Sequence, residues 1–202
     1  QLESTGDADG AAWAQFILHH TDLPEAIAAS WPWAFTLRLR VAVQAQALEL
    51  HLSVHNTGEQ AFPFSAALHS YFSIDQLSEA RVNGLQRVRY SDETPQDALQ
   101  AEEELQFSDK LDRIYYQLPG ALTLQSGGHL LRLEQQGFTD AVVWNPGAQD
   151  AAALPDLADD EYPRFICIEP ALIQPDLLAA GAEWTGRQHI VVRSAGSAPT
   201  SI

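Results

Sequence analysis

Residues 35–43 read Phe-Thr-Leu-Arg-Leu-Arg-Val-Ala-Val, which is the clearest alternation of apolar and other side chains in the sequence. The pattern returns at 48–54 as Leu-Glu-Leu-His-Leu-Ser-Val, and the turn-forming run Asn56-Thr57-Gly58 follows directly. Successive side chains of a β-strand point to opposite faces, so each alternating run predicts a strand with one apolar face. Strands joined by tight turns predict an antiparallel sheet.

Other short runs of strand-forming residues continue this pattern, with turn residues such as Gly, Pro and Asn between them. We expect strands at 11–19, 64–72, in two pieces within 81–90, and at 114–117, 121–125, 129–134, 141–144, 164–169 and 183–194. No segment has a convincing helical period. The acidic stretch 91–108 could form a short helix, but we interpret it as a solvated excursion. The small, polar tail from Ala195 is expected to fray. The sequence therefore predicts an all-β fold, a large antiparallel β-sandwich that forms a single domain over residues 1–202.

The composition excludes several classes of function. The chain has 27 acidic and 11 basic residues, a formal net charge of −16, which disfavours nucleic-acid binding and opposes anionic ligands outside a local basic pocket. The single cysteine, Cys167, excludes an internal disulfide and a multi-cysteine zinc site. No apolar run approaches the roughly 20 residues that span a bilayer, and no signal-peptide pattern opens the chain. We therefore expect no membrane partner and a reducing, cytoplasmic location.

His69 is the first candidate for chemistry. In the expected strand 64–72 it shares a face with Ser65, Ala67 and Tyr71, and the two small neighbours leave room beside the imidazole ring. An imidazole at the floor of a hollow can donate a proton near neutral pH. The alternative is a structural histidine with satisfied hydrogen bonds, which would be favoured for an isolated histidine.

Glu169 is the second candidate, because it closes the apolar run Phe-Ile-Cys-Ile-Glu at 165–169. Burying a carboxylate without a partner costs several kcal/mol. Glu169 therefore either lies at the wet end of its strand or has a raised pKa that suits a general base. Cys167, on the same face of that strand, is expected to be a small buried apolar side chain.

Asp112 and Trp144 are candidates for sugar binding. The two carboxylate oxygens of Asp112 can accept hydrogen bonds from hydroxyl groups, although a surface ion pair with a neighbouring Lys or Arg is the alternative. Trp144 can stack on the apolar face of a sugar ring, or can be an ordinary core or rim tryptophan. The sequence has no zinc-type spacing, no phosphate-binding glycine loop and no nucleophile elbow, so no metal or nucleotide cofactor is expected.

Four short motifs occur in a fixed order and carry a resemblance. They are His-Ser-Tyr-Phe at 69–72, Asp-Arg-Ile-Tyr at 112–115, Val-Val-Trp-Asn-Pro-Gly at 142–147 and Phe-Ile-Cys-Ile-Glu at 165–169. With these motifs the chain resembles the aldose 1-epimerase superfamily, and within it the hexose-6-phosphate mutarotases (glucose-6-phosphate 1-epimerase). The resemblance implies a galactose mutarotase-like supersandwich with an open sugar groove. It also implies that His69 and Glu169 are catalytic and that Asp112 binds sugar hydroxyls.

The family also carries an N-terminal portion that has no match here. That portion holds a second histidine, in a His-Gly-Phe segment, and the arginines that the resemblance assigns to phosphate. We therefore expect a domain that is N-terminally incomplete relative to the family.

The predicted function is a cofactor-free mutarotase. It would interconvert the α and β anomers of a hexose 6-phosphate by general acid/base ring opening, with a sugar or sugar phosphate as its small-molecule partner. One alternative is a mutarotase of unphosphorylated aldoses, which the charge of −16 favours. Two others are a non-catalytic carbohydrate-binding sandwich and a truncated protein that is inactive and unstable alone because a sheet edge is exposed.

Overall fold

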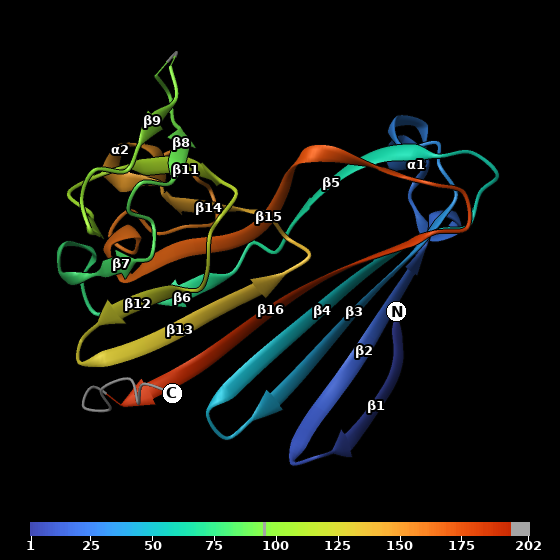
Figure 1. The fold of residues 1–202 in the computed structure, drawn as a ribbon, viewed down its shortest axis with the longest axis horizontal. Helices are drawn as coiled ribbons and strands as arrows, with labels where there is room; N and C mark the ends of the chain where they lie inside the picture. The colour runs from blue at the N-terminus through green and yellow to red at the C-terminus, as the bar shows by residue number, and fades with distance from the viewer. Residues whose placement is uncertain (95, 195–202) are drawn as a thin grey trace.

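The structure is a computed structural model that describes residues 1–94 and 96–194, and β-strands dominate it (Figure 1). The tail from Ala195, for which fraying is predicted, lies outside the described residues. The strands are β1 (Leu2–Ala8), β2 (Ala11–His19), β3 (Phe35–Gln44), β4 (Ala47–Asn56), β5 (Phe62–Ala67), β6 (Tyr71–Ser73), β7 (Arg81–Asn83), β8 (Arg89–Ser91), β9 (Ala98–Leu99), β10 (Glu104–Gln106), β11 (Leu111–Tyr116), β12 (Leu122–Ser126), β13 (His129–Gln136), β14 (Asp140–Asn145), β15 (Phe165–Leu178) and β16 (Glu183–Ser194). The helical segments are short: 3₁₀ turns at His20–Asp22, Leu77–Glu79 and Tyr162–Arg164, and α-helices α1 (Glu25–Ser30) and α2 (Gly147–Ala151).

Two antiparallel sheets make up the fold. A nine-stranded sheet has the order β1-β2-β3-β4-β16-β13-β12-β7-β10. A seven-stranded sheet has the order β5-β15-β14-β11-β8-β9, and β6 follows β5 along the same edge of β15. In Figure 1, β12 and β13 of the first sheet lie below β14 and β15 of the second, while β1 to β4 extend away to the side. The predicted antiparallel β-sandwich is confirmed.

The two alternating runs form neighbouring antiparallel strands. β3 and β4 pair in register, with Leu39 opposite Leu52 and Arg40 opposite His51. After β4, the side-chain oxygen of Asn56 accepts the amide of Gly58 at 2.9 Å, which closes the expected turn. The strands on either side of this turn, β4 and β5, lie in different sheets and do not pair, so the turn at Asn56-Thr57-Gly58 crosses between the sheets instead of closing a hairpin. The strand at Leu2–Ala8 was not predicted, because β1 is an edge strand whose residues are nearly all exposed and therefore show no apolar period.

The apolar side chains gather in two clusters. One cluster lies between the sheets behind β6, β11, β14 and β15, and its largest fully buried member is Tyr115. The other gathers residues of β3, β4, β5 and the far part of β15, and its aromatic contacts include those of Phe62 with Trp31 and Trp33. Among residues 1–94 and 96–194, no helix has the length and the hydrophobicity to cross a membrane.

The prediction of one continuous strand over 64–72 is wrong. β5 ends at Ala67 and β6 begins at Tyr71, although the expected alternation of burial continues across the gap. The cause is Pro170 on the neighbouring strand, which has no amide hydrogen to donate to Leu68. The Leu68 carbonyl instead accepts the amide of Ser70 at 2.8 Å, which forms a three-residue turn centred on His69.

Candidate active site

His69 lies directly opposite Glu169. The register of β15 is the same on both sides of the turn, with Ala67 opposite Ala171 and Tyr71 opposite Cys167. Counting inward from either pairing places His69 against Glu169. The backbone hydrogen bonds fall on the neighbouring pairs, from Leu68 to the Pro170 carbonyl and from Ile168 to the Ser70 carbonyl. His69 and Glu169 are thus a non-hydrogen-bonded pair, the arrangement in which two facing side chains lie closest.

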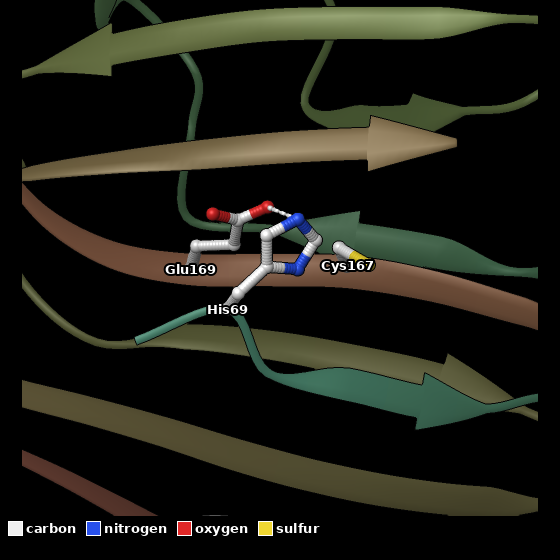
Figure 2. A group of neighbouring side chains, drawn as sticks. All are labelled: His69, Cys167 and Glu169. Atoms are coloured by element: carbon white, nitrogen blue, oxygen red, sulfur yellow. Dashed lines mark ion pairs between the residues drawn. The ribbon is translucent and has the colours of Figure 1, made fainter. Parts of the chain in front are cut away.

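The two side chains meet at the outer surface of the seven-stranded sheet. The Nε2 atom of His69 lies 3.3 Å from Oε1 of Glu169. The imidazole side chain is 53% exposed and the carboxylate is 8% exposed, so one group is open to solvent and the other is nearly enclosed. Figure 2 shows the ring of His69 reaching across β15 to the Glu169 carboxylate, with Cys167 two residues away on the same strand. An imidazole and a carboxylate at this distance can move protons at two neighbouring atoms of one ligand.

Aromatic rings surround the imidazole. Tyr71 stacks on His69 with a centroid distance of 4.9 Å and an interplanar angle of 13°, and Trp144 meets His69 edge-on at 5.9 Å. Phe165 lies 5.3 Å from Tyr71 and 6.0 Å from Trp144 and links the two rings. Such contacts fix the orientation of His69 and provide apolar surface of the kind on which sugar rings stack.

Asp112 and Trp144 lie on the same face of the sheet as the pair. Asp112 is opposite Trp144 across β11 and β14, and Trp144 is opposite Cys167 across β14 and β15. The ion pair considered for Asp112 does not form among the described residues, because Lys110 binds Glu93 and Asp150 instead. Within residues 1–94 and 96–194, the carboxylate of Asp112 therefore faces the site without an ion pair, and Lys110 acts on it only through its charge.

The surroundings of Glu169 make its carboxylate more basic. Burial is the main cause of a raised pKa at Glu169, and the negative charge of Asp112 adds to it, while His69 acts in the opposite direction. The pKa of Asp112 is also raised, mainly by partial burial, with Lys110 opposing and Glu93 contributing. Of the two alternatives for Glu169, the structure thus favours a carboxylate with a raised pKa.

The residues around Glu169 include a set that could in principle bind a metal ion. One ligand atom each from His69, Cys167 and Glu169 lies within 4.8 Å of the others. However, Cys167 is fully buried, as predicted, and burial together with Glu169 raises the pKa of its thiol to about 12. A metal ion binds the thiolate, so it would have to displace a tightly held proton. The arrangement suits proton transfer by the His69–Glu169 pair better than metal binding.

Two aromatic residues of the site were not assigned a role from the sequence. Tyr71 and Phe165 carry the rings that flank His69 and Trp144. A signal for both was present, since strand alternation places Tyr71 on the face of His69 and Phe165 on the face of Glu169. The alternation does not show which of the aromatic residues on a face reach the histidine.

The fold and the site define a class of protein: an antiparallel β-sandwich that carries an imidazole–carboxylate pair on the open face of one sheet. A family model described as aldose 1-epimerase matches residues 2–191. The chain therefore belongs to the aldose 1-epimerase family, which confirms the resemblance seen in the motifs.

Individual relatives agree with this family. A protein of Cenchrus ciliaris named "Putative glucose-6-phosphate 1-epimerase" is 34% identical over 147 residues, which cover 69% of this chain and 45% of the relative. A protein of Escherichia coli with the same name is 29% identical over 132 residues, 61% of this chain and 42% of the relative. The matches thus span less than half the length of these curated relatives.

Solved structures show the same fold. The crystal structure of a "putative mutarotase" from Salmonella typhimurium superposes with a TM-score of 0.84 at 25% identity, covering 96% of this chain and 64% of that one. A galactose mutarotase-like protein from Clostridium acetobutylicum has the same fold, with a TM-score of 0.69 at 14% identity and coverage of 96% and 66%.

Proposed function

We propose that this chain is the catalytic part of a mutarotase that interconverts the α and β anomers of a hexose 6-phosphate. The observation that carries the proposal is the 3.3 Å contact between Nε2 of His69 and Oε1 of Glu169 on an open face of the sheet. Exchange of anomers needs two proton transfers, at the two oxygens bonded to C1: the hydroxyl oxygen O1 and the ring oxygen O5. A neighbouring carboxylate and imidazole can perform both.

In the proposed mechanism, Glu169 removes the proton from O1 while the protonated His69 donates a proton to O5. The electron pair of the O1–H bond forms the carbonyl, and the C1–O5 bond breaks with its electrons on O5. Rotation about C1–C2 then presents the other face of the aldehyde. On closure His69 takes the proton back from O5, C1–O5 forms again, and Glu169 returns its proton to O1. No proton is gained or lost in the cycle.

The surroundings of the pair support these roles. The raised pKa of Glu169 makes its carboxylate a better proton acceptor than an exposed glutamate. The ring of His69 is half exposed, so a ligand can reach it from solvent. We assign Trp144 to the apolar face of the sugar, and the carboxylate of Asp112 to its hydroxyl groups.

The 6-phosphate is the part of the proposal that rests on relatives. Two relatives from different organisms carry the name glucose-6-phosphate 1-epimerase. The charge of −16 favours an uncharged aldose instead. Anomer exchange rates on glucose and on glucose 6-phosphate, measured by exchange NMR at equal concentration, decide between the two. A higher kcat/KM on the phosphorylated sugar supports the proposal, and a higher value on glucose overturns this part of it.

Substitution of the pair tests the chemistry. We expect Glu169→Gln and His69→Asn to lower kcat by about 10²–10⁴-fold, because each removes one proton-transfer group. Glu134→Gln is the matched control, since Glu134 is a partly exposed carboxylate that pairs with Arg132 and His189 elsewhere. Wild-type exchange rates in both variants would overturn the assignment. Saturable sugar binding by the wild-type protein without faster exchange would instead indicate a carbohydrate-binding module.

A further inference from the structure

Gln188 is a buried polar residue that reaches from the other sheet to the back of the site. It lies on β16 of the nine-stranded sheet and is only 2% exposed. Its Oε1 atom accepts a 2.6 Å hydrogen bond from the hydroxyl group of Ser70, and its Nε2 atom donates to the carbonyl of Ile168 at 3.5 Å. The side chain therefore joins the two sheets by hydrogen bonds across the apolar core.

Both partners of Gln188 are backbone neighbours of the catalytic pair. Ser70 follows His69, and Ile168 precedes Glu169. Side chains alternate along these segments, so His69 and Glu169 face outward while Ser70 and Ile168 face the core. One amide thus contacts both chain segments that carry the pair, from the side that a ligand does not reach.

The turn at His69 creates the need for this amide. In a regular ladder, the amide of Ser70 would donate to the carbonyl of Ile168, which lies opposite to it. That amide instead donates to Leu68, because Pro170 has no hydrogen to give the Leu68 carbonyl. The Ile168 carbonyl is left without its ladder donor inside the core, and Gln188 supplies one.

We propose that Gln188 is a positioning residue, which holds the turn of residues 68–70 in the conformation that sets His69 against Glu169. The inference rests on the proposed function of the pair. Without the side-chain amide of Gln188, the Ile168 carbonyl has no donor unless the backbone amide of Ser70 turns back toward it. That movement opens the turn and displaces His69, and a displacement of about 1 Å can cost about 10²-fold in rate.

The test compares Gln188→Met, which keeps the side-chain volume but removes both hydrogen bonds, with Ser70→Ala, which removes one. We expect kcat for anomer exchange to fall by about 10- to 100-fold in Gln188→Met, with KM changed less than kcat. The double variant should show much less than the product of the two single effects, because both substitutions break the same contact.

The pH profile separates positioning from a loss of folded protein. The groups that border Glu169 are His69, Asp112, Cys167 and Tyr71, and of these only His69 lowers its pKa. If His69 moves away, the acid limb of kcat/KM shifts to higher pH. Reduced stability alone would leave the position of that limb unchanged.

Gln135→Met is the matched control. Gln135 lies opposite Gln188 on β13, and its amide likewise donates to backbone carbonyls, those of Phe138 and Asp140, at 3.0 Å. We expect this variant to lose stability without a shift in the acid limb. Additive effects of Gln188→Met and Ser70→Ala, or an unmoved limb in both, would overturn the proposal. If Gln188→Met does not fold, the position of the acid limb of kcat/KM in Ser70→Ala alone decides whether the proposal holds.

A spectroscopic readout keeps this inference separate from the proposed function. The ¹H–¹³C signals of the His69 ring, assigned by their loss in His69→Asn, report its position even in an inactive protein. We expect them to move in Gln188→Met and Ser70→Ala and to stay in Gln135→Met. If the signals do not move in these variants, the positioning role is overturned. If they move but the wild-type protein has no exchange activity, only the catalytic assignment is overturned.

Discussion

Leu68 faces Pro170 across the junction of β5, β6 and β15, and only one of the two possible hydrogen bonds joins them. The Leu68 amide donates to the Pro170 carbonyl at 3.1 Å, but Pro170 has no amide hydrogen to donate to the Leu68 carbonyl. The Leu68 carbonyl instead accepts the Ser70 amide, which forms a turn at His69 between β5 and β6. Both strands nevertheless keep the same register on β15. A proline on one strand thus shapes the turn that carries the histidine of the other.

Pro170→Ala should therefore reduce activity more than stability. The alanine amide can donate to the Leu68 carbonyl and favour a regular strand through 68–70, which moves His69 from its turn. We expect kcat to fall by about tenfold or more and the free energy of unfolding to change by about 1 kcal/mol or less, as chemical denaturation measures it. Pro119→Ala, in an exposed turn, is the control for the flexibility that any proline loss adds. Full activity in Pro170→Ala would contradict this account of the turn.

Glu169→Gln should be at least as stable as the wild-type protein at neutral pH. The pKa of Glu169 is raised on folding, so the folded chain holds a proton there more tightly than the unfolded chain does. The resulting cost to stability is absent below the ordinary pKa of glutamate and grows as pH rises through the folded value. The difference in unfolding free energy between the two proteins, measured from pH 4 to 8, should change in favour of the variant as pH rises. A difference that moves toward the wild type would contradict the raised pKa.

Asp112→Asn should move the acid limb of kcat/KM to lower pH. The negative charge of Asp112 raises the pKa of Glu169, so its removal lets Glu169 lose its proton at lower pH. Loss of a carboxylate from the proposed sugar site should also raise KM several-fold. Asp75→Asn removes one charge beside Gly127, away from the pair, and should change neither quantity. An acid limb that moves upward in Asp112→Asn would exclude this electrostatic coupling.

The thiol of Cys167 should be unreactive in the folded protein. The side chain is fully buried, and burial and Glu169 raise its pKa to about 12, so almost no thiolate is present at pH 8. A chromogenic disulfide reagent should release less than a tenth of an equivalent from native protein within minutes, and one equivalent per chain in denaturant, since the chain has one cysteine. Cys167→Ser is the blank, and rapid release from native protein would show that the site opens to this depth.

Local alternation predicted most of the strands and the face on which the key side chains lie. It predicted the strands at 35–43 and 48–54, and it placed His69 with Tyr71 on one face of their strand and Glu169 with Cys167 on one face of theirs. The burial of Cys167 was expected from the usual burial of a free cysteine.

Local alternation missed β1, whose polar sequence has no apolar period because the strand lies at a sheet edge. The interpretation of 91–108 as a solvated excursion was also wrong, because β9 and β10 lie within it and each is the end strand of a sheet. Alternation also joined β5 and β6 into one strand, because the proline that interrupts them is about a hundred residues away.

The sequence by itself determined the fold class, since period-2 alternation and tight turns leave little besides an antiparallel sandwich, and four motifs identified the family. Only the tertiary structure decided that His69 and Glu169 are opposite each other, that Lys110 pairs with Glu93 and Asp150 and not with Asp112, and that Gln188 lies behind the turn. The physical reason is that alternation depends on each strand alone. Register and cross-core hydrogen bonds depend instead on how distant strands jointly bury their apolar faces and satisfy their buried polar groups.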